Sequence, residues 1–195
     1  PVMVLADAFM AQTMESVEIR ERKADLGDVS SWALGKRTER SGRRSVLKSI
    51  CLNPSQMEEL NIRLQRKYRI MQKEALVETF EMEDAQLAIA AFGTPARISG
   101  TAVRKLRNRG YRVGLVRPKT LYPFPEKAFS ALPDTVRHIL SIEMNSGQMV
   151  RDIRAVTQKN IQITHMGHAG CAIPSSDEIA FRCTEILAEM EGSEG

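Results

Sequence analysis

The sequence predicts an α/β protein: a small, doubly wound, mostly parallel sheet, preceded by a connector and a long helix. Two observations support this prediction. From residue 85 onward, short apolar runs alternate with amphipathic helical segments, which is typical of a parallel sheet. The apolar runs are nearly continuous, which indicates strands buried on both faces. Right-handed crossovers between such strands then place helices on both sides of the sheet.

The chain before residue 85 has a different character. Residues 1–16, with the apolar run VMVLA, indicate a strand and the turn after it. Because a buried parallel strand rarely opens a natural chain, we expect a C-terminal fragment of a longer polypeptide. Residues 17–50 carry scattered Gly, Ser and charge without a period, so we expect an extended connector.

A long helix is predicted over residues 53–77. Asn53 or Ser55 can cap it, and Pro54 suits its first turn. Apolar residues recur at steps of three and four, which indicates one apolar stripe. The stripe consists of Met57, Leu60, Leu64, Tyr68 and Met71.

The remaining elements follow in alternation. Thr94 is the expected cap of the first of their helices, Pro95 its first residue and Gly110 its terminator. We expect strands at residues 85–93, 111–118, 137–145 and 161–167, and helices at residues 94–110, 124–133, 146–159 and 174–191.

Composition excludes several classes of protein. No apolar run approaches the roughly 20 residues of a membrane span.

The net charge of +4 arises from one run, residues 36–48, which holds six basic residues against Glu39. A nucleic-acid arm is one interpretation of this run, but no aromatic residue interleaves the charges, so we expect a solvated or partner-covered connector and no nucleic-acid partner. The three cysteines lie far apart, which indicates free thiols in a reducing cytoplasm.

Loops at the carboxyl ends of the strands are where such sheets bind ligands. The first of them, FGTPAR, has one glycine and not GxGxxG, so we expect no dinucleotide there, although the helix start near Arg97 remains a weak anion site. His165, His168 and Cys171 have a spacing suited to a metal, but a fourth ligand is missing nearby, so we expect no metal. His138 starts a strand, and we interpret it as structural.

The loop after the third of these strands holds Glu143, Asn145 and Gln148. They form either a binding cluster or, with Asn145 or Ser146 as cap, the start of a helix. No arrangement of residues in the sequence predicts a catalytic group.

The stretch LVRPKTLYPFP, residues 115–125, holds three prolines, which make it stiff. Tyr122 and Phe124 are then presented on a rigid turn, either to another chain or domain or into their own domain. We place both rings, with Glu143, Asn145 and Gln148, in a candidate subunit or domain interface.

Five segments carry a resemblance to a known family: PVMVLADAFMAQTMESVE, LNPSQMEELNIRLQRKY, AFGTPARISGTAVRKLRNRGYRVGLVRPKTLYPFP, ILSIEMNSGQMVRDIR and GHAGCAIPSSDEI. In the same order, they resemble the alpha subunit of 2-oxoacid:ferredoxin oxidoreductases, nearest to the 2-oxoisovalerate type. Family members assigned to 2-oxoglutarate and those assigned to branched-chain acids have similar sequences in this region.

The resemblance implies oxidative decarboxylation of a 2-oxoacid on thiamine diphosphate, with transfer of the acyl group to coenzyme A and of electrons through iron–sulfur clusters to ferredoxin. It implies that residues 1–16 end a thiamine pyrimidine-binding domain, that residues 17–84 are the connector and long helix, and that residues 85–195 are a transketolase C-terminal-like domain. Thiamine diphosphate, Mg²⁺ and the clusters would reside in the full complex with the beta and other subunits. We expect none of them on this fragment, which would serve assembly and be inactive alone. The alternative is a non-catalytic protein-interaction module.

Overall fold

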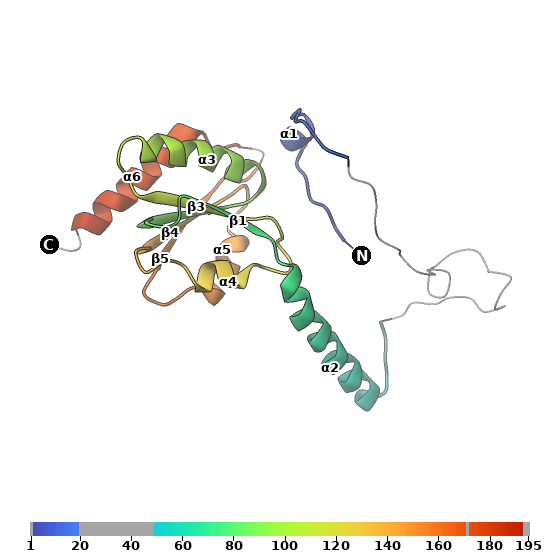
Figure 1. Cartoon of the computed structure of the whole chain (residues 1–195). Coiled ribbons are helices and arrows are strands. Elements are labelled where there is room, and N and C mark those ends of the chain that lie inside the picture. Colours follow the sequence, from blue (N-terminus) through green and yellow to red (C-terminus); the bar gives the residue numbers. More distant parts are fainter. Residues whose placement is uncertain (1, 20–48, 171, 193–195) are drawn as a thin grey trace. The chain divides into compact units, whose positions relative to one another are not determined.

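The computed structural model describes residues 2–19, 49–170 and 172–192 (Figure 1). The sheet and its covering helices belong to a compact unit made of residues 1–13 and 67–195, and residues 14–66 form a second unit. The helices are α1 (Ala8–Ala11), α2 (Pro54–Met71), the short 3₁₀ helix η2 (Gln72–Glu74), α3 (Gly93–Arg107), α4 (Glu126–Ser130), α5 (Met149–Val156) and α6 (Ser176–Gly192). The strands are β1 (Val77–Phe80), β2 (Leu87–Ala91), β3 (Val113–Pro118), β4 (His138–Glu143) and β5 (Gln162–Gly167).

The five strands form one mostly parallel sheet in the order β1-β3-β2-β4-β5. Strand β2 lies at the centre, with Leu87 opposite Val113 of β3 on one side and opposite His138 of β4 on the other. The chain runs from β2 outward to β3, then crosses back over β2 to β4 and on to β5. The predicted doubly wound α/β fold is confirmed.

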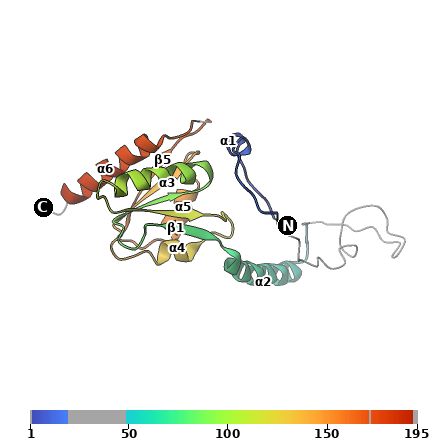
Figure 2. The ribbon, with the colours of Figure 1, turned by 45° about the horizontal axis from the view of Figure 1, so that its top comes forward.

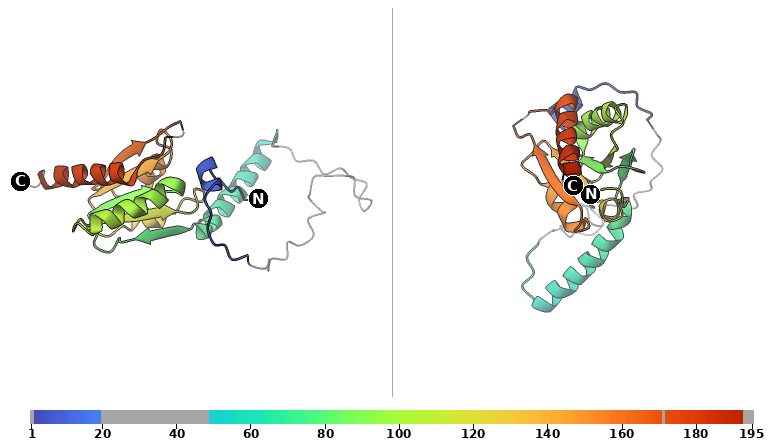
Figure 3. Two further views of the ribbon diagram at one scale, coloured as in Figure 1. Left: turned by 90° about the horizontal axis from the view of Figure 1, so that it is seen from above. Right: turned by 90° about the vertical axis from the view of Figure 1, so that its left-hand side faces the viewer.

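Helices cover both faces of the sheet. Figures 1 and 2 show α3 and α6 on one face, and α4 and α5 on the other. Seen from above in Figure 3, α3 and α6 lie side by side over the strands. Alternate residues of β2 serve the two faces: Leu87, Ile89 and Ala91 pack under α3 and α6, while Ala88 and Ala90 pack under α4 and α5.

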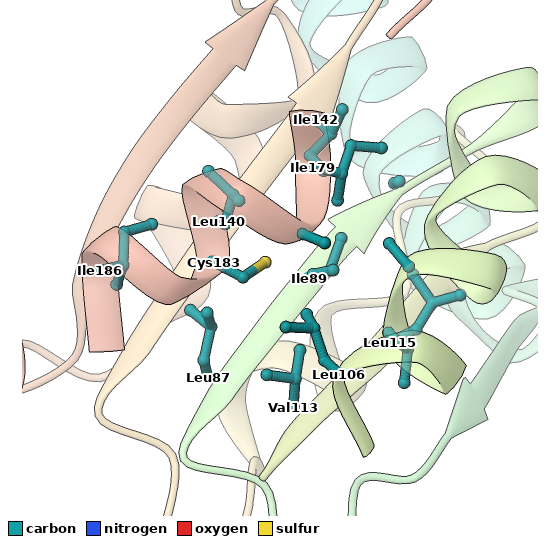
Figure 4. Packing of buried hydrophobic residues seen from close by; sticks show 14 of the residues in the cluster. Leu87, Ile89, Leu106, Val113, Leu115, Leu140, Ile142, Ile179, Cys183 and Ile186 are labelled. Carbon is teal, nitrogen blue, oxygen red and sulfur yellow. The ribbon is translucent and has the colours of Figure 1, made fainter. Parts of the chain in front are cut away.

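The larger core lies between the sheet and the pair α3 and α6. Figure 4 shows Cys183 of α6 among leucine and isoleucine side chains of the strands and of both helices. Burial raises the pKa of the Cys183 thiol to about 12, because the charged thiolate would lose its hydration there. Cys183 is therefore a core residue with an unreactive thiol.

Strand β1 is the element that the sequence pattern did not reveal. It pairs antiparallel with β3, and Val77 lies opposite Pro118. The predicted helix to residue 77 is wrong at this end: α2 stops at Met71, and the sheet begins before the expected domain start at Ala85. The strand has only four residues and lies at the sheet edge, mostly exposed, so it lacks a continuous apolar run.

The predicted strand within residues 1–16 is also not formed. Residues 2–7 have no strand partner in the sheet, and α1 follows them. The side chains of Val2, Met3, Val4 and Leu5 are exposed. The apolar pattern of a buried strand is present there without the neighbouring strand that would pair with it.

Arg107 holds the turn between β1 and β2 against the sheet. Its guanidinium donates to the carboxylate of Asp84 and to the backbone oxygens of Val113 and Glu81. Glu81 has φ +54°, a left-handed conformation that few non-glycine residues adopt. The hydrogen bond from Arg107 also lowers the pKa of the Asp84 carboxyl.

This turn approaches the backbone of β3 so closely that Gly114 cannot carry a side chain. A Cβ at residue 114 would lie 2.6 Å from the backbone oxygen of Glu81 and 2.5 Å from the sulfur of Met82. We predict that Gly114→Ala lowers the free energy of unfolding by about 1–3 kcal/mol, because the turn must move. Urea unfolding followed by circular dichroism measures this change.

Gly100→Ala is the matched control. In α3, a Cβ at residue 100 would meet nothing nearer than the Arg104 guanidinium at 4.0 Å. Alanine favours a helix by about 1 kcal/mol over glycine, so the control should be neutral or stabilising. Equal effects of the two substitutions would contradict the close contact between the turn and β3.

Candidate functional site

The carboxyl ends of β2 and β4 form the point at which the strand order reverses, where doubly wound sheets usually bind ligands. The loop after β4 contains three of the residues predicted as an interface. Glu143 is the last residue of β4, and its side chain is fully buried (0% exposed).

The Glu143 carboxylate is the cap of α5. It accepts hydrogen bonds from the backbone N–H groups of Gln148 (3.2 Å), Met149 (2.8 Å) and Val150 (2.9 Å). The hydroxyl of Ser141 donates a fourth, at 3.0 Å. A carboxylate has about four lone-pair sites, so these donors leave no acceptor capacity for a substrate. The side chain of Glu143 is thus turned inward and holds a helix end, which is the capping alternative for this loop.

Asn145 has a similar local role. Its side-chain oxygen accepts from the backbone N–H groups of Gly147 (2.7 Å) and Gln148 (3.0 Å) and so fixes the loop before α5. Of the two interpretations of this loop, helix capping is therefore the one observed for Glu143 and Asn145. Gln148 is exposed, and its side chain remains available on the surface.

His165 of β5 lies beside this loop, with its Nε2 atom 3.8 Å from Glu143 Oε1. The Nε2 atom is buried and has no hydrogen-bond partner among the described residues. Gly167 allows this close packing, because a Cβ there would meet the His165 ring and, at 2.6 Å, the backbone oxygen of Asn145. The sequence pattern did not reveal this pairing of His165 with Glu143, since the two residues come from different strands.

His168 lies beside a different carboxylate. Its Nε2 lies 3.1 Å from Glu178 Oε1, and the backbone N–H of Glu178 in turn donates to the hydroxyl of Ser175 at the start of α6. Cys171, the third residue of the suggested metal motif, lies outside the described residues. Within the described part of the chain, no group of three or more His, Cys, Asp or Glu side chains is placed to hold a metal ion.

The start of α3 is occupied by the chain's own carboxylate. The helix begins at Gly93, one residue before the predicted cap, and the cap residue Phe92 has no side-chain hydrogen bond. The hydroxyl of Thr94 donates instead to Asp7 Oδ2 at 2.9 Å. The prediction of Thr94 as the cap is wrong, and Asp7 now stands beside the helix start proposed as an anion site.

The rings of LVRPKTLYPFP separate into two environments. Phe124 is buried (8% exposed) and stacks on Phe129 of α4, with ring centroids 5.2 Å apart. Tyr122 is 67% exposed, and its ring packs in a T-shaped arrangement with that of Tyr68, with ring centroids 6.3 Å apart. Phe124 thus packs into its own domain, the second of the two alternatives for these rings, while Tyr122 is presented outward.

With this geometry described, the chain can be compared with known proteins. Residues 85–179 match the family model of the pyruvate:ferredoxin oxidoreductase core domain II. A ketoisovalerate oxidoreductase subunit, VorB, of Methanothermobacter thermautotrophicus is 37% identical over 155 residues, which is 79% of this chain and 44% of that subunit. The chain belongs to the 2-oxoacid:ferredoxin oxidoreductase family.

Relatives within this family carry different substrate names. The 2-oxoglutarate synthase subunit KorA of Methanothermobacter marburgensis is 32% identical over 97 residues, which is 50% of this chain and 26% of that subunit. The chain therefore spans less than half the length of these curated relatives.

A solved structure confirms the fold. The 2-oxoglutarate:ferredoxin oxidoreductase from Magnetococcus marinus, with 2-oxoglutarate, coenzyme A and succinyl-CoA bound, superimposes with a TM-score of 0.61. The match covers 69% of this chain and 24% of the solved one, at 23% identity. The solved protein thus shares the fold of the doubly wound domain observed here.

The capping of α5 by Glu143 should contribute to the stability of the fold. Glu143→Gln replaces one acceptor oxygen by an NH₂ group that faces backbone donors. We predict a loss of about 1–3 kcal/mol in the free energy of unfolding, because a buried N–H loses its partner. Urea unfolding of the same chain measures it, with Glu185→Gln as control. Glu185 is a partly exposed partner of Arg182, so its change should stay within about 0.5 kcal/mol. Equal stability of Glu143→Gln and wild type would contradict the capping role.

His138 provides a second prediction, on pH. Its Nε2 lies 3.0 Å from the Thr164 hydroxyl, and burial lowers the pKa of its ring below the ordinary 6.5. Glu189 opposes this shift, while Arg182 adds to it. In the acid range below about pH 6.5 the unfolded chain binds a proton that the folded chain does not, so the free energy of unfolding falls as the pH falls.

Urea unfolding at several pH values between about 7 and 5 tests this sign. His138→Gln keeps a polar side chain at this position but does not titrate there, so it should reduce the slope of the free energy of unfolding against pH. An unchanged slope would show that His138 is not the group responsible.

Proposed function

We propose that this chain is part of the alpha subunit of a 2-oxoacid:ferredoxin oxidoreductase whose complex acts on 2-oxoisovalerate. The observation that carries the proposal is the match to VorB, which is higher in identity and extends over more of the chain than the match to KorA of M. marburgensis. The complex would convert the 2-oxoacid and coenzyme A to an acyl-CoA and CO₂, with two electrons passed to ferredoxin.

The part proposed for this chain is assembly. The described loops at the carboxyl ends of β4 and β5 are engaged in internal contacts: Glu143 caps α5, and His168 is paired with Glu178. Tyr122 stands exposed on its loop and supports a contact with another subunit or domain. As the resemblance implies, thiamine diphosphate, Mg²⁺ and the iron–sulfur clusters would be held by other parts of the complex.

The same proposal extends to the domains. Residues 1–16 would complete a thiamine pyrimidine-binding domain, which agrees with the exposed apolar side chains of Val2 to Leu5. The transketolase C-terminal-like domain would hold residues 85–195 together with β1, because β1 pairs with β3.

The test is a substrate comparison on the native complex that contains this chain, purified with its partner subunits. We expect turnover with 2-oxoisovalerate, coenzyme A and a viologen acceptor, at a kcat/KM at least about tenfold above that for 2-oxoglutarate, which corresponds to about 1.4 kcal/mol of discrimination. A preference for 2-oxoglutarate would assign the other substrate, and turnover of neither acid would refute the proposed activity. Turnover by this chain without partners would refute the assembly role.

A further inference from the structure

Helix α2 carries an apolar stripe that the described residues cover only in part, at the end where Tyr68 packs against Tyr122. Met57, Leu60, Leu64 and Met71 are only partly buried, and Tyr68 is 39% exposed. No residue of the helix is fully buried. A helix of 18 residues is marginal in water by itself and owes its stability to the packing of such a stripe. The stripe therefore indicates a surface that is covered in the assembled protein.

The charges beside the stripe indicate what covers it. Between Leu60 and Lys73 the sequence holds five basic residues and no acidic one. No ion pair within the described part of the chain involves any of these five. They are Arg63, Arg66, Lys67, Arg69 and Lys73.

Helical geometry divides these cations into two groups. At 100° per residue, Arg63 and Lys67 lie one turn apart, directly beside Leu60 and Leu64 on one flank of the stripe. Arg66 and Arg69 lie on the opposite face, away from the stripe, and Lys73 lies beyond the helix in η2. A surface that covers the stripe must therefore lie against the two cations on its flank.

We propose that α2 docks its apolar stripe onto a protein surface of another subunit that is apolar at the centre and has carboxylates at the rim facing Arg63 and Lys67. This inference rests on the proposed role of the chain in a multi-subunit complex. Charge complementarity selects an acidic partner, because a second copy of α2 would bring Arg63 and Lys67 close to the same cations of its twin.

The experiment compares two double charge reversals in the native complex. Arg63→Glu with Lys67→Glu changes the flank of the stripe, and Arg66→Glu with Arg69→Glu makes the same change in charge on the opposite face. We expect the first pair to weaken subunit association by roughly tenfold or more at low salt, with a smaller effect at high salt, and the second pair to change it by less than about twofold. Light scattering after size-exclusion chromatography and titration of the purified subunits measure the association.

Leu64→Gln tests the apolar part of the contact, and it should weaken subunit association at every salt concentration. Circular dichroism of each variant checks that the chain remains folded; a variant that unfolds is replaced by Arg63→Gln with Lys67→Gln, which removes the charges without adding repulsion. Equal effects of the two charge reversals, or effects of neither, would overturn the proposal. Self-association of the chain that Leu64→Gln abolishes would identify a second copy as the occupant and overturn it as well.

These outcomes are separate from those of the substrate test. If the wild-type complex assembles but oxidises neither 2-oxoacid, the proposed activity fails while the role of α2 can still be measured. If the complex is active and the flank variants assemble normally, the docking proposal alone fails.

Discussion

The burial of β2 on both faces is the constraint on which the rest of this domain depends. A central parallel strand has no solvent face, so it needs helices on both sides and a neighbouring strand at each edge. The crossover from β3 over β2 to β4 supplies both, because it moves the chain from the face of α3 to the face of α4 and α5. The same crossover places the loops after β2 and β4 side by side.

The loop after β4 shows how a typical ligand position can be used for structure. A carboxylate at a helix N-terminus is favourable because it faces free backbone N–H groups and the positive end of the helix dipole. In many proteins the anion at such a site is a ligand, whereas here it is Glu143 from the preceding strand, fully buried and fully hydrogen-bonded. Asp7 stands in a comparable position beside the start of α3. Both helix starts thus meet carboxylates of the chain itself.

The exposed features lie elsewhere and differ in character from these loops. Tyr122 and the stripe of α2 present apolar surface, and Arg63 and Lys67 add positive charge beside that stripe, without an ion pair to any described residue. Apolar surface with a charged rim is the usual composition of a protein–protein interface. Together with the membership of the chain in an oxidoreductase family, these features favour a role in assembly over one in chemistry.

The sequence was sufficient to predict β2 to β5 and the helices between them, because continuous apolar runs and capping signals are local. It was insufficient for β1, which has four mostly exposed residues and forms only by pairing with β3. For Glu143, two roles were equally consistent with the spacing, since the choice depends on which way one side chain turns. Phe124 and Tyr122 are two residues apart in a Pro-rich loop, and only the packing of Phe129 shows which ring is inside. The predicted basic connector lies outside the described residues.

The most direct test of an assembly role is hydrogen exchange measured by mass spectrometry on this chain, free and within its native complex. The account predicts slower exchange on assembly in peptides from α2 and in those around Tyr122, with little change at residues 144–148, where the hydrogen bonds of Glu143 and Asn145 are already formed. Protection confined to residues 144–148, with α2 and the Tyr122 loop unchanged, would contradict it and would place the contact surface at the carboxyl ends of the strands.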